Sequence, residues 1–266
     1  MGVPMRMKIE AVLERLVEVL SRWDAVDTVC FLDRDREDIY DPYFFISLDV
    51  YFSGELPSYK ERMEELSFTG AFESAPGNRK DRFLVGDLPV RLEYKSIPDV
   101  EAVLGAEPGA FELVEDRVSY MFYRLVNGTI LFSRSDWLAS VRERLEDLPS
   151  SFWRVLRDEA RAKMEHFLSD LCAAAALEDE YFFLVSASGF IQSVCAVLFA
   201  VNRRFEPGGR EMERHVFSLP QLPYSFKGYF QQFVRYSHDF PMEKKREIAE
   251  NLARHVVKMC LADEGS

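Results

Sequence analysis

The 266-residue sequence contains few of the residues that build metal centres or disulfide frameworks. Its four cysteines are far apart, lie in apolar surroundings and form no C-x-x-C pair, so we interpret them as reduced core residues. Each of the four histidines is isolated as well. Nothing in the sequence indicates a serine or cysteine triad, a G-x-G-x-x-G fingerprint or a P-loop. The sequence therefore contains none of the usual motifs of thiol chemistry, of serine or cysteine hydrolases, or of P-loop proteins, and its function has to be inferred from other features.

Long apolar runs are also missing. No uninterrupted apolar stretch reaches the roughly 18 residues that cross a bilayer, and the N-terminal stretch MGVPMRMKIEAVLERL lacks the apolar centre of a signal peptide. With 48% hydrophobic and 29% charged residues, the chain is typical of a soluble globular protein with one large or two ordinary domains. We expect a cytoplasmic protein without membrane contact.

Negative charge exceeds positive charge, with 45 Asp and Glu against 33 Lys and Arg, which gives a formal net charge of −12. Binding to duplex nucleic acid normally needs a clustered Lys/Arg surface, so we expect no duplex nucleic acid partner. Carboxylates in the first half could instead hold a divalent cation such as Mg²⁺, although an acidic solubilising surface explains the same composition.

The first half of the sequence mixes helical and extended patterns. Residues 8–23 place apolar side chains on one helical stripe, and residues 57–67 and 97–105 predict short helices. Strands are predicted at 26–32 and 43–52, and a hairpin over 81–97 turns near Gly86 and Asp87. Asn127 and Gly128 form a turn before a further extended segment, residues 129–133.

From Asp136 onward the apolar period is 3.6 residues and no convincing strand pair follows. Proline and glycine separate the helical segments 136–148, 151–178, 179–205, 209–219, 225–237 and 242–261. Residues 173–176 and 190–201 should lie in the bundle core. The sequence therefore predicts an α+β protein, with a mixed β-sheet domain over residues 1–133 and an all-α helical bundle over residues 134–266.

The strand YFFISLDVYF, residues 43–52, carries one acidic side chain among aromatic and aliphatic neighbours. On a two-residue period one face is entirely apolar, and Asp49 falls on the other face with Ser47 and three aromatic residues. The carboxylate therefore either reaches solvent between large rings or belongs to a site.

A second carboxylate lies in PVRLEYK, residues 89–95, where Arg91, Glu93 and Lys95 alternate with inward apolar residues. If the two strands are neighbours, Asp49 and Glu93 converge and can hold a divalent ion that bridges phosphate oxygens. The alternative is that Glu93, between two cations, belongs to an ordinary solvated strand face. We predict adjacent strands, with both carboxylates on a face that lines a cleft covered by the helical half.

The acidic segment FLDRDREDIYD, residues 31–41, resembles a calcium loop only superficially. Counted from Asp33, the glycine position is Asp38 and the position of the bidentate glutamate is Phe44, so we interpret the segment as a solvated loop. Further along, Arg203 and Arg204 follow a long apolar helix. They can either interact with the helix dipole or contact a phosphate, and Lys227 is another candidate for a phosphate contact.

The stretches SLDVYF, RLVNGTILFSRSDWLASVRERL and VCAVLFAVNRRFEPGGREMERHVFSLPQLP resemble the nucleotidyltransferase superfamily that includes the kanamycin and lincosamide nucleotidyltransferases. The resemblance covers nearly the whole chain and implies a small mixed-sheet domain followed by a helical bundle. The family motif is a Gly-Ser after a strand, an acidic-apolar-acidic triplet about ten residues later and a third acid on a later strand. Here no Gly-Ser follows the first strand, and the triplet aligns as Ser47-Leu48-Asp49 or as Asp49-Val50-Tyr51.

For an active member, the resemblance implies Mg²⁺-dependent transfer of a nucleoside monophosphate from a nucleoside triphosphate to a hydroxyl of a small molecule or a protein. Asp49 and Glu93 would be catalytic and hold the metal, with Asp41 or Asp38 completing its shell. Nucleotide contacts would come from Arg203, Arg204, Lys227 and Ser47. Because one acid and the Gly-Ser turn are missing, the alternative is a catalytically inactive binding or regulatory module of the same fold.

Overall fold

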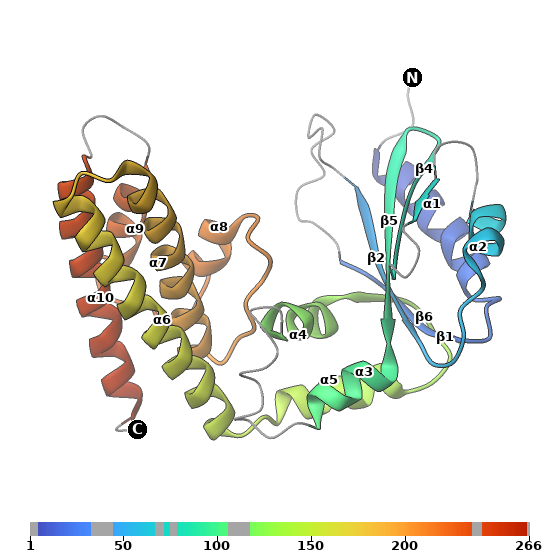
Figure 1. Cartoon of the computed structure of the whole chain (residues 1–266). Coiled ribbons are helices and arrows are strands. Elements are labelled where there is room, and N and C mark those ends of the chain that lie inside the picture. Colours follow the sequence, from blue (N-terminus) through green and yellow to red (C-terminus); the bar gives the residue numbers. More distant parts are fainter. Residues whose placement is uncertain are drawn as a thin grey trace. The chain divides into compact units, whose positions relative to one another are not determined.

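The chain folds as an α+β protein whose first part alternates strands and helices and whose second part is helical (Figure 1). The computed structural model describes residues 5–32, 45–66, 72–74, 79–105, 118–235 and 241–264. Within these ranges every strand ends at or before Ser133, and the regular structure after it is helical. The predicted fold class and the predicted change from mixed to helical structure are confirmed.

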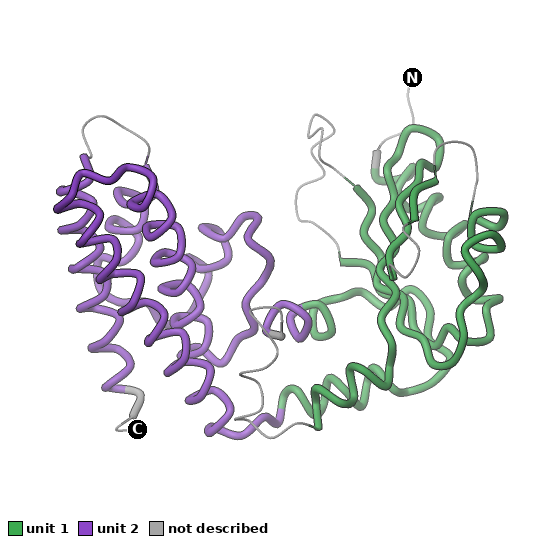
Figure 2. The backbone as a smooth tube through the Cα atoms, viewed as in Figure 1, with its two compact units in different colours: residues 1–107, 124–146 green, residues 108–123, 147–266 purple. Residues whose placement is uncertain are grey.

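Two compact units share the chain, and each is built from two segments (Figure 2). The first unit comprises residues 1–107 and 124–146, and the second comprises residues 108–123 and 147–266. Helix α4, Val118–Asn127, contributes its start to the second unit and its last turn to the first. The division into separate domains at residue 133 stays a prediction.

The first unit is organised around a sheet of six strands in the order β3-β4-β5-β2-β1-β6. The strands are β1 Val26–Phe31, β2 Ile46–Phe52, β3 Phe72–Ser74, β4 Lys80–Val85, β5 Leu88–Ser96 and β6 Thr129–Ser133. Strands β2 and β5 pair in parallel and the other neighbours pair antiparallel. The predicted hairpin turn is present between β4 and β5, where Gly86 has a φ of 64° that glycine tolerates without strain.

One face of this sheet forms the core of the first unit. The apolar positions of β2, β4 and β5 alternate with polar ones, so Leu48, Phe83 and Leu92 point to the same side. Helix α1, Met5–Leu20, packs its apolar stripe on that side, and Leu16 and Leu20 are fully buried there. We call this the core face of the sheet, and the side that carries Asp49 the opposite face.

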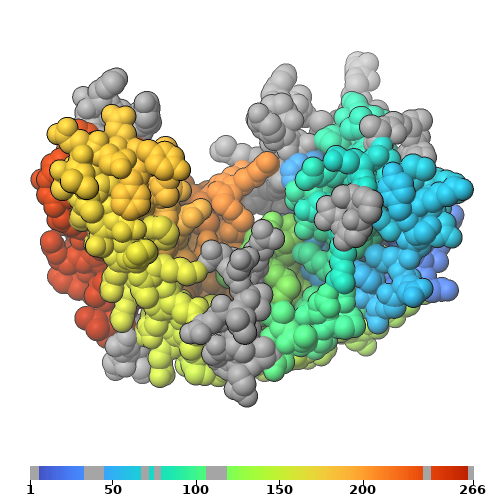
Figure 3. Space-filling view, in the orientation of Figure 1, coloured from blue at the N-terminus to red at the C-terminus, as the bar shows by residue number. Residues whose placement is uncertain are grey.

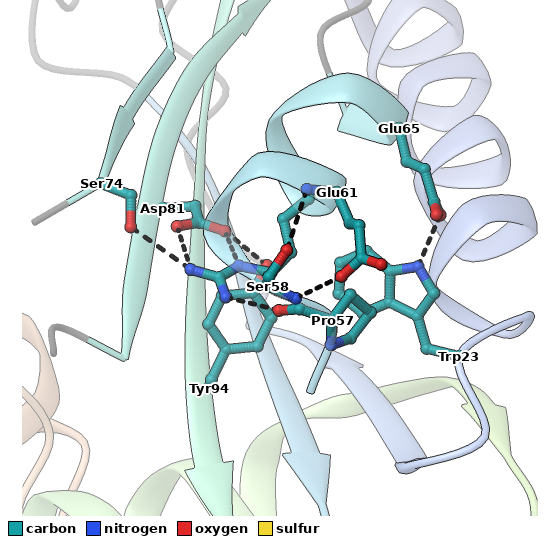
Figure 4. Close-up of polar contacts among 9 residues, drawn as sticks. Trp23, Pro57, Ser58, Glu61, Glu65, Ser74, Asp81 and Tyr94 are labelled. Atoms are coloured by element: carbon teal, nitrogen blue, oxygen red, sulfur yellow. Dashed lines mark hydrogen bonds and ion pairs between the residues drawn. The ribbon is translucent and has the colours of Figure 1, made fainter. Parts of the chain in front are cut away.

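A buried polar network fixes helix α2, Tyr59–Leu66, against the core face (Figure 4). Arg62 donates from Nε and Nη2 to the two oxygens of Asp81, at 2.9 and 3.3 Å. The hydroxyl of Tyr94 donates to Asp81 Oδ2 at 2.7 Å. Asp81 is completely buried, so these donors replace the water that its carboxylate loses on folding.

Helices α3, Ile97–Leu104, and α5, Trp137–Glu146, contact each other in the first unit. The indole N–H of Trp137 donates to Glu101 at 2.8 Å, and Arg144 donates to the other oxygen of Glu101 at 2.7 Å. The ring of Trp137 also packs against Tyr51 on the opposite face of the sheet, with ring centroids 5.2 Å apart. Helix α5 thus supplies part of the cover over that face.

The second unit is a helical bundle of α6 Ser150–Ala176, α7 Glu180–Val201, α8 Met212–Phe217, α9 Phe226–Val234 and α10 Met242–Glu264. Its core is apolar, and the predicted core stretch 190–201 is buried except for Ile191 and Ala196, which are partly buried, and Gln192, which is exposed. Of the predicted core residues 173–176, Ala174 is buried, but the prediction was wrong for Ala173 and Ala176, which are exposed because α6 turns only one face inward. Helix α7 is long and apolar enough to span a membrane, but a bundle core helix passes the same test.

Candidate functional site

The two carboxylates that the sequence singles out are brought together by the strand register. Strands β2 and β5 pair in parallel with Asp49 directly beside Glu93. Directly paired residues share a face of the sheet, so both carboxylates belong to the opposite face. The predicted adjacency of Asp49 and Glu93 is confirmed, whereas a cleft lined by the helical half stays a prediction.

Asp49 is buried, with only 2% of its surface exposed, and it is held by two cations. Arg124, from the last turn of α4, donates from Nε to Oδ2 at 2.6 Å and from Nη2 to Oδ1 at 2.8 Å. Lys95 Nζ lies 2.9 Å from Oδ2. A bidentate ion pair, in which one arginine donates to both oxygens of a carboxylate, is one of the strongest polar contacts that a protein makes. Both oxygens of Asp49 are therefore engaged within the first unit.

Electrostatics keeps this carboxylate ionised. Burial by itself would raise the pKa of Asp49, but the charges of Lys95 and Arg124 outweigh burial and lower the pKa below its ordinary value. The pKa values of two neighbouring groups are raised instead. Burial, followed by the charge of Asp49, raises the pKa of the Cys30 thiol to about 12 and raises that of Tyr51 as well. At neutral pH the site thus contains a charged Asp49 beside a neutral thiol and a neutral phenol.

Two more polar side chains lie on β2 beside this ion pair. The Ser47 hydroxyl is 3.3 Å from Arg124 Nη2 and accepts a hydrogen bond from it. The Tyr51 hydroxyl is fully buried and has no hydrogen-bond partner among the described residues. A buried hydroxyl without a hydrogen-bond partner lowers the stability of the fold. The hydrogen bonding on this face of the sheet is therefore incomplete at Tyr51.

Glu93 is paired as well, at the more open part of the opposite face. Lys80 Nζ lies 3.3 Å from its Oε1 and Arg91 Nε lies 3.1 Å from the same oxygen. Across β4 and β5, Lys80 is the register partner of Glu93 and Arg82 is the partner of Arg91. Like charges placed directly opposite each other destabilise a strand pair, and an anion above them would relieve that repulsion. The opposite face thus carries a cationic row of Lys80, Arg82, Arg91 and Lys95 in a protein of net charge −12.

A magnesium ion fits this donor set poorly. Mg²⁺ needs carboxylate oxygens that are free to coordinate it, but both oxygens of Asp49 and Oε1 of Glu93 already contact cationic side chains, four in all. A metal ion beside Asp49 would also be repelled by two positive charges only a few ångströms away. Nowhere in the described parts of the chain do three or more His, Cys, Asp or Glu side chains form a group that could bind a metal. Asp41, the predicted third ligand, and Asp38 lie outside the described residues.

Of the predicted phosphate contacts in the second unit, Arg203 and Arg204 lie just after the end of α7 and Lys227 lies on α9. Asn202 ends α7 by donating to Leu198 O at 2.8 Å and accepting from the Gln221 N–H at 2.8 Å. Arg203 follows in a left-handed conformation, φ 52°, and its Nη2 is 3.2 Å from Ser150 Oγ. Arg204 and Lys227 are exposed, and Lys227 Nζ lies 5.4 Å from the ring centre of Phe217. Their role in nucleotide binding stays a prediction.

Sequence reasoning missed Arg124, the side chain that determines the chemistry at Asp49. The pattern over residues 118–127 indicates a segment that leads into the Asn127-Gly128 turn, and it predicts no helix there. The available signal was a single cation in the apolar segment MFYRLV, the counterpart of a single acid in the apolar strand around Asp49. Each is costly to bury alone, and pairing them removes most of that cost.

Comparisons with known proteins found a matching family model and similar solved structures. A family model described as a domain of unknown function (DUF4037) matches residues 118–210. The comparison with curated proteins found no match. Among solved structures, the chain is similar to a nucleotidyltransferase-like protein from Exiguobacterium sibiricum, with 12% sequence identity, a TM-score of 0.48, and coverage of 97% of this chain and 77% of that chain. The DUF4037 segment includes Arg124 and leaves Asp49 and Glu93 outside it.

Proposed function

We propose that this protein is a catalytically inactive, nucleotidyltransferase-like binding module that takes up the phosphate groups of a nucleotide without a metal ion. The proposal rests on one observation, the engagement of both Asp49 oxygens by Arg124 and Lys95. In the family that the sequence resembles, the acids of this strand are expected to hold Mg²⁺. Here two side-chain cations occupy the positions around the carboxylate that a metal would need.

The loss of metal ligands in the sequence supports the same proposal. Ser47 replaces the first acid of the triplet in the preferred alignment, and its hydroxyl joins the ion pair by accepting from Arg124. Ser47 and Arg124 thus place a neutral hydroxyl and a positive charge where the motif would have a second carboxylate. The substitution and the new ion pair are chemically consistent with each other.

Phosphate is the ligand that the remaining charges fit. Arg82 and Arg91 are register partners with like charge, and arginine forks match phosphate oxygens well. The ring of Phe45 provides an apolar surface beside these charges, with its centroid 4.1 Å from the Arg91 guanidinium carbon. Aromatic surfaces of this kind stack nucleobases, which adds about 1–3 kcal/mol per base. A nucleotide combines both features, an anionic phosphate chain and a flat base.

Calorimetry with ATP, GTP, CTP and UTP, each in EDTA and in Mn²⁺, tests this proposal. We expect at least one nucleotide to bind equally well in both buffers and to bind more weakly as salt is raised. The double variant Arg82→Gln/Arg91→Gln should reduce the affinity at least tenfold. Lys60→Gln removes an exposed charge from α2, beside the core face, and should leave the affinity unchanged.

An active metal-dependent enzyme is the second candidate, because the Asp49–Glu93 register is favourable for metal-assisted phosphoryl transfer. That candidate predicts nucleotide binding that requires Mn²⁺, and pyrophosphate release that stops in Asp49→Asn while the variant keeps its circular dichroism spectrum. Either result would overturn the inactive module. Failure of all four nucleotides to bind in either buffer would overturn the assignment of a nucleotide ligand.

A further inference from the structure

An apolar surface lies at the α6–α7 turn of the second unit and has no role in the fold. Twelve large hydrophobic side chains are exposed in the described residues, and five of them fall within the short stretch from Leu177 to Val185. Tyr181 is 79% exposed and Leu184 is 70% exposed. Single exposed apolar residues are ordinary, but a group of this size in one stretch of a surface indicates an interaction site.

The spacing of these residues is regular. Tyr181, Leu184 and Val185 are exposed at positions i, i+3 and i+4, so they form a stripe along one side of α7. Ser188, three residues further on, is also exposed, and its hydroxyl ends the apolar part of that side, whereas Phe183 points into the bundle. In Figure 3 the residues near 180 form part of the visible surface of the second unit. We call the set Tyr181, Leu184 and Val185 the α7 stripe.

Along the sequence, the charge on either side of the α7 stripe has a single sign. Between Lys163 and Arg203 the sequence contains no lysine or arginine, although α6 and α7 both cross this segment. It does contain five acids: Glu165, Asp170, Glu178, Asp179 and Glu180. Asp179 has a structural reason to be acidic, since its carboxylate caps α7 by accepting from the Phe182 N–H at 2.9 Å. Capping does not explain why the whole surrounding segment excludes cations.

We infer that the α7 stripe is a docking surface for a protein partner that presents an amphipathic helix with lysine or arginine along its edges. The apolar residues of such a helix would pack on Tyr181, Leu184 and Val185, in the manner of helix-on-helix recognition at i, i+3 and i+4 positions. Its cations would face Glu178 and Glu180 at the turn. Apolar contact supplies the affinity, and complementary charge selects the partner and its orientation.

Charge separates this partner from two other occupants. A second copy of the chain would bring another acidic hairpin, and another molecule of net charge −12, against the same surface. An anionic bilayer would meet three consecutive acids at the start of α7. Both arrangements put like charges together, whereas a basic helix pairs opposite charges.

The test uses the full chain and a fluorescent peptide of about 18 residues, roughly five helical turns, built from leucine and lysine at amphipathic helical spacing. Its control peptide has glutamate in place of every lysine. Anisotropy titrations should show binding of the lysine peptide only. Leu184→Asp and Tyr181→Asp should each weaken that binding at least tenfold, because central apolar anchors dominate helix recognition.

Leu261→Asp is the matched protein control, since Leu261 is also exposed in the second unit but lies on α10, away from the stripe in sequence. It should bind the lysine peptide like the unaltered chain. Both stripe residues are largely exposed, so thermal unfolding by circular dichroism should be unchanged in all three variants. Equal binding of the two peptides, or equal binding by Leu184→Asp, would overturn the inference. So would a dimer in light scattering, or vesicle binding, that Leu184→Asp abolishes.

Discussion

Two buried aspartates point to opposite faces of the same sheet, and each is gripped by an arginine. Asp81 lies on the core face and accepts hydrogen bonds from Arg62 and the Tyr94 hydroxyl (Figure 4). Asp49 lies on the opposite face and forms ion pairs with Arg124 and Lys95. In both cases the arginine comes from a helix and uses two nitrogens. The same pair of residue types is therefore used twice in one unit.

The surroundings of the two pairs differ, and the difference indicates a structural role for Asp81 and a ligand-binding role for Asp49. The carboxylate of Asp81 contacts one cation among the described residues and accepts from one neutral donor, the Tyr94 hydroxyl, so its single charge is balanced and the network serves to fix α2. Asp49 has a second cation, and beside it the Tyr51 hydroxyl has no partner in the described residues. An excess of positive charge and an unsatisfied donor are features of a ligand site more than of an anchor.

Removing each arginine tests this contrast with the largest expected effect. Arg62→Met leaves Asp81 buried with a single neutral donor, and we expect a loss of about 3–5 kcal/mol in the free energy of unfolding. Arg124→Met leaves Asp49 with Lys95, so the loss should be smaller, about 1–3 kcal/mol. Urea unfolding followed by circular dichroism measures both. A cost for Arg124→Met equal to or above that for Arg62→Met would contradict the distinction.

The sequence predicted the arrangement of the sheet better than its polar partners. Alternation in residues 43–52 and 89–95 identified both strands and the faces of Asp49 and Glu93, because a two-residue period is a local property. The contact between Arg124 and Asp49 joins residues 75 positions apart and requires a helix that the sequence pattern did not indicate. Such pairing is determined by packing in three dimensions, so a local pattern can reveal an unpaired charge but cannot name its partner.

The tyrosines give a matched pair of smaller changes. Tyr94→Phe removes a donor from a buried carboxylate, and we expect it to lower the free energy of unfolding by about 1.5–3 kcal/mol. Tyr51→Phe removes a buried hydroxyl without a partner among the described residues, so the free energy of unfolding should stay constant or rise slightly. Urea unfolding of the two variants in parallel provides the measurement. Equal destabilisation would mean that the Tyr51 hydroxyl is satisfied and that the two faces are alike.

The acid stability of the protein gives the smallest effect and concerns Lys95, which has no counterpart beside Asp81 in the described part of the chain. The pKa of Asp49 is lower in the folded chain than its ordinary value of about 3.9, which applies in the unfolded chain. The unfolded state therefore binds a proton more readily than the folded state between these two pKa values. The stabilisation from Asp49 is complete above about pH 4 and is lost as the pH falls through the lower, folded pKa.

Asp49→Asn should consequently flatten the decline of the free energy of unfolding below about pH 4, by at most about 1.4 kcal/mol per pH unit for a single proton. Asp87→Asn, at an exposed aspartate in the β4–β5 turn, controls for the loss of one negative charge and should decline like the unaltered chain. Lys95→Met removes one of the two cations that lower the pKa of Asp49, so stability should begin to fall at a higher pH. If Lys95→Met left the acid limb unchanged, Arg124 alone would hold the carboxylate. The Asp49 site would then be an arginine–aspartate anchor like that of Asp81, and Lys95 would be available to a ligand without any cost to the fold.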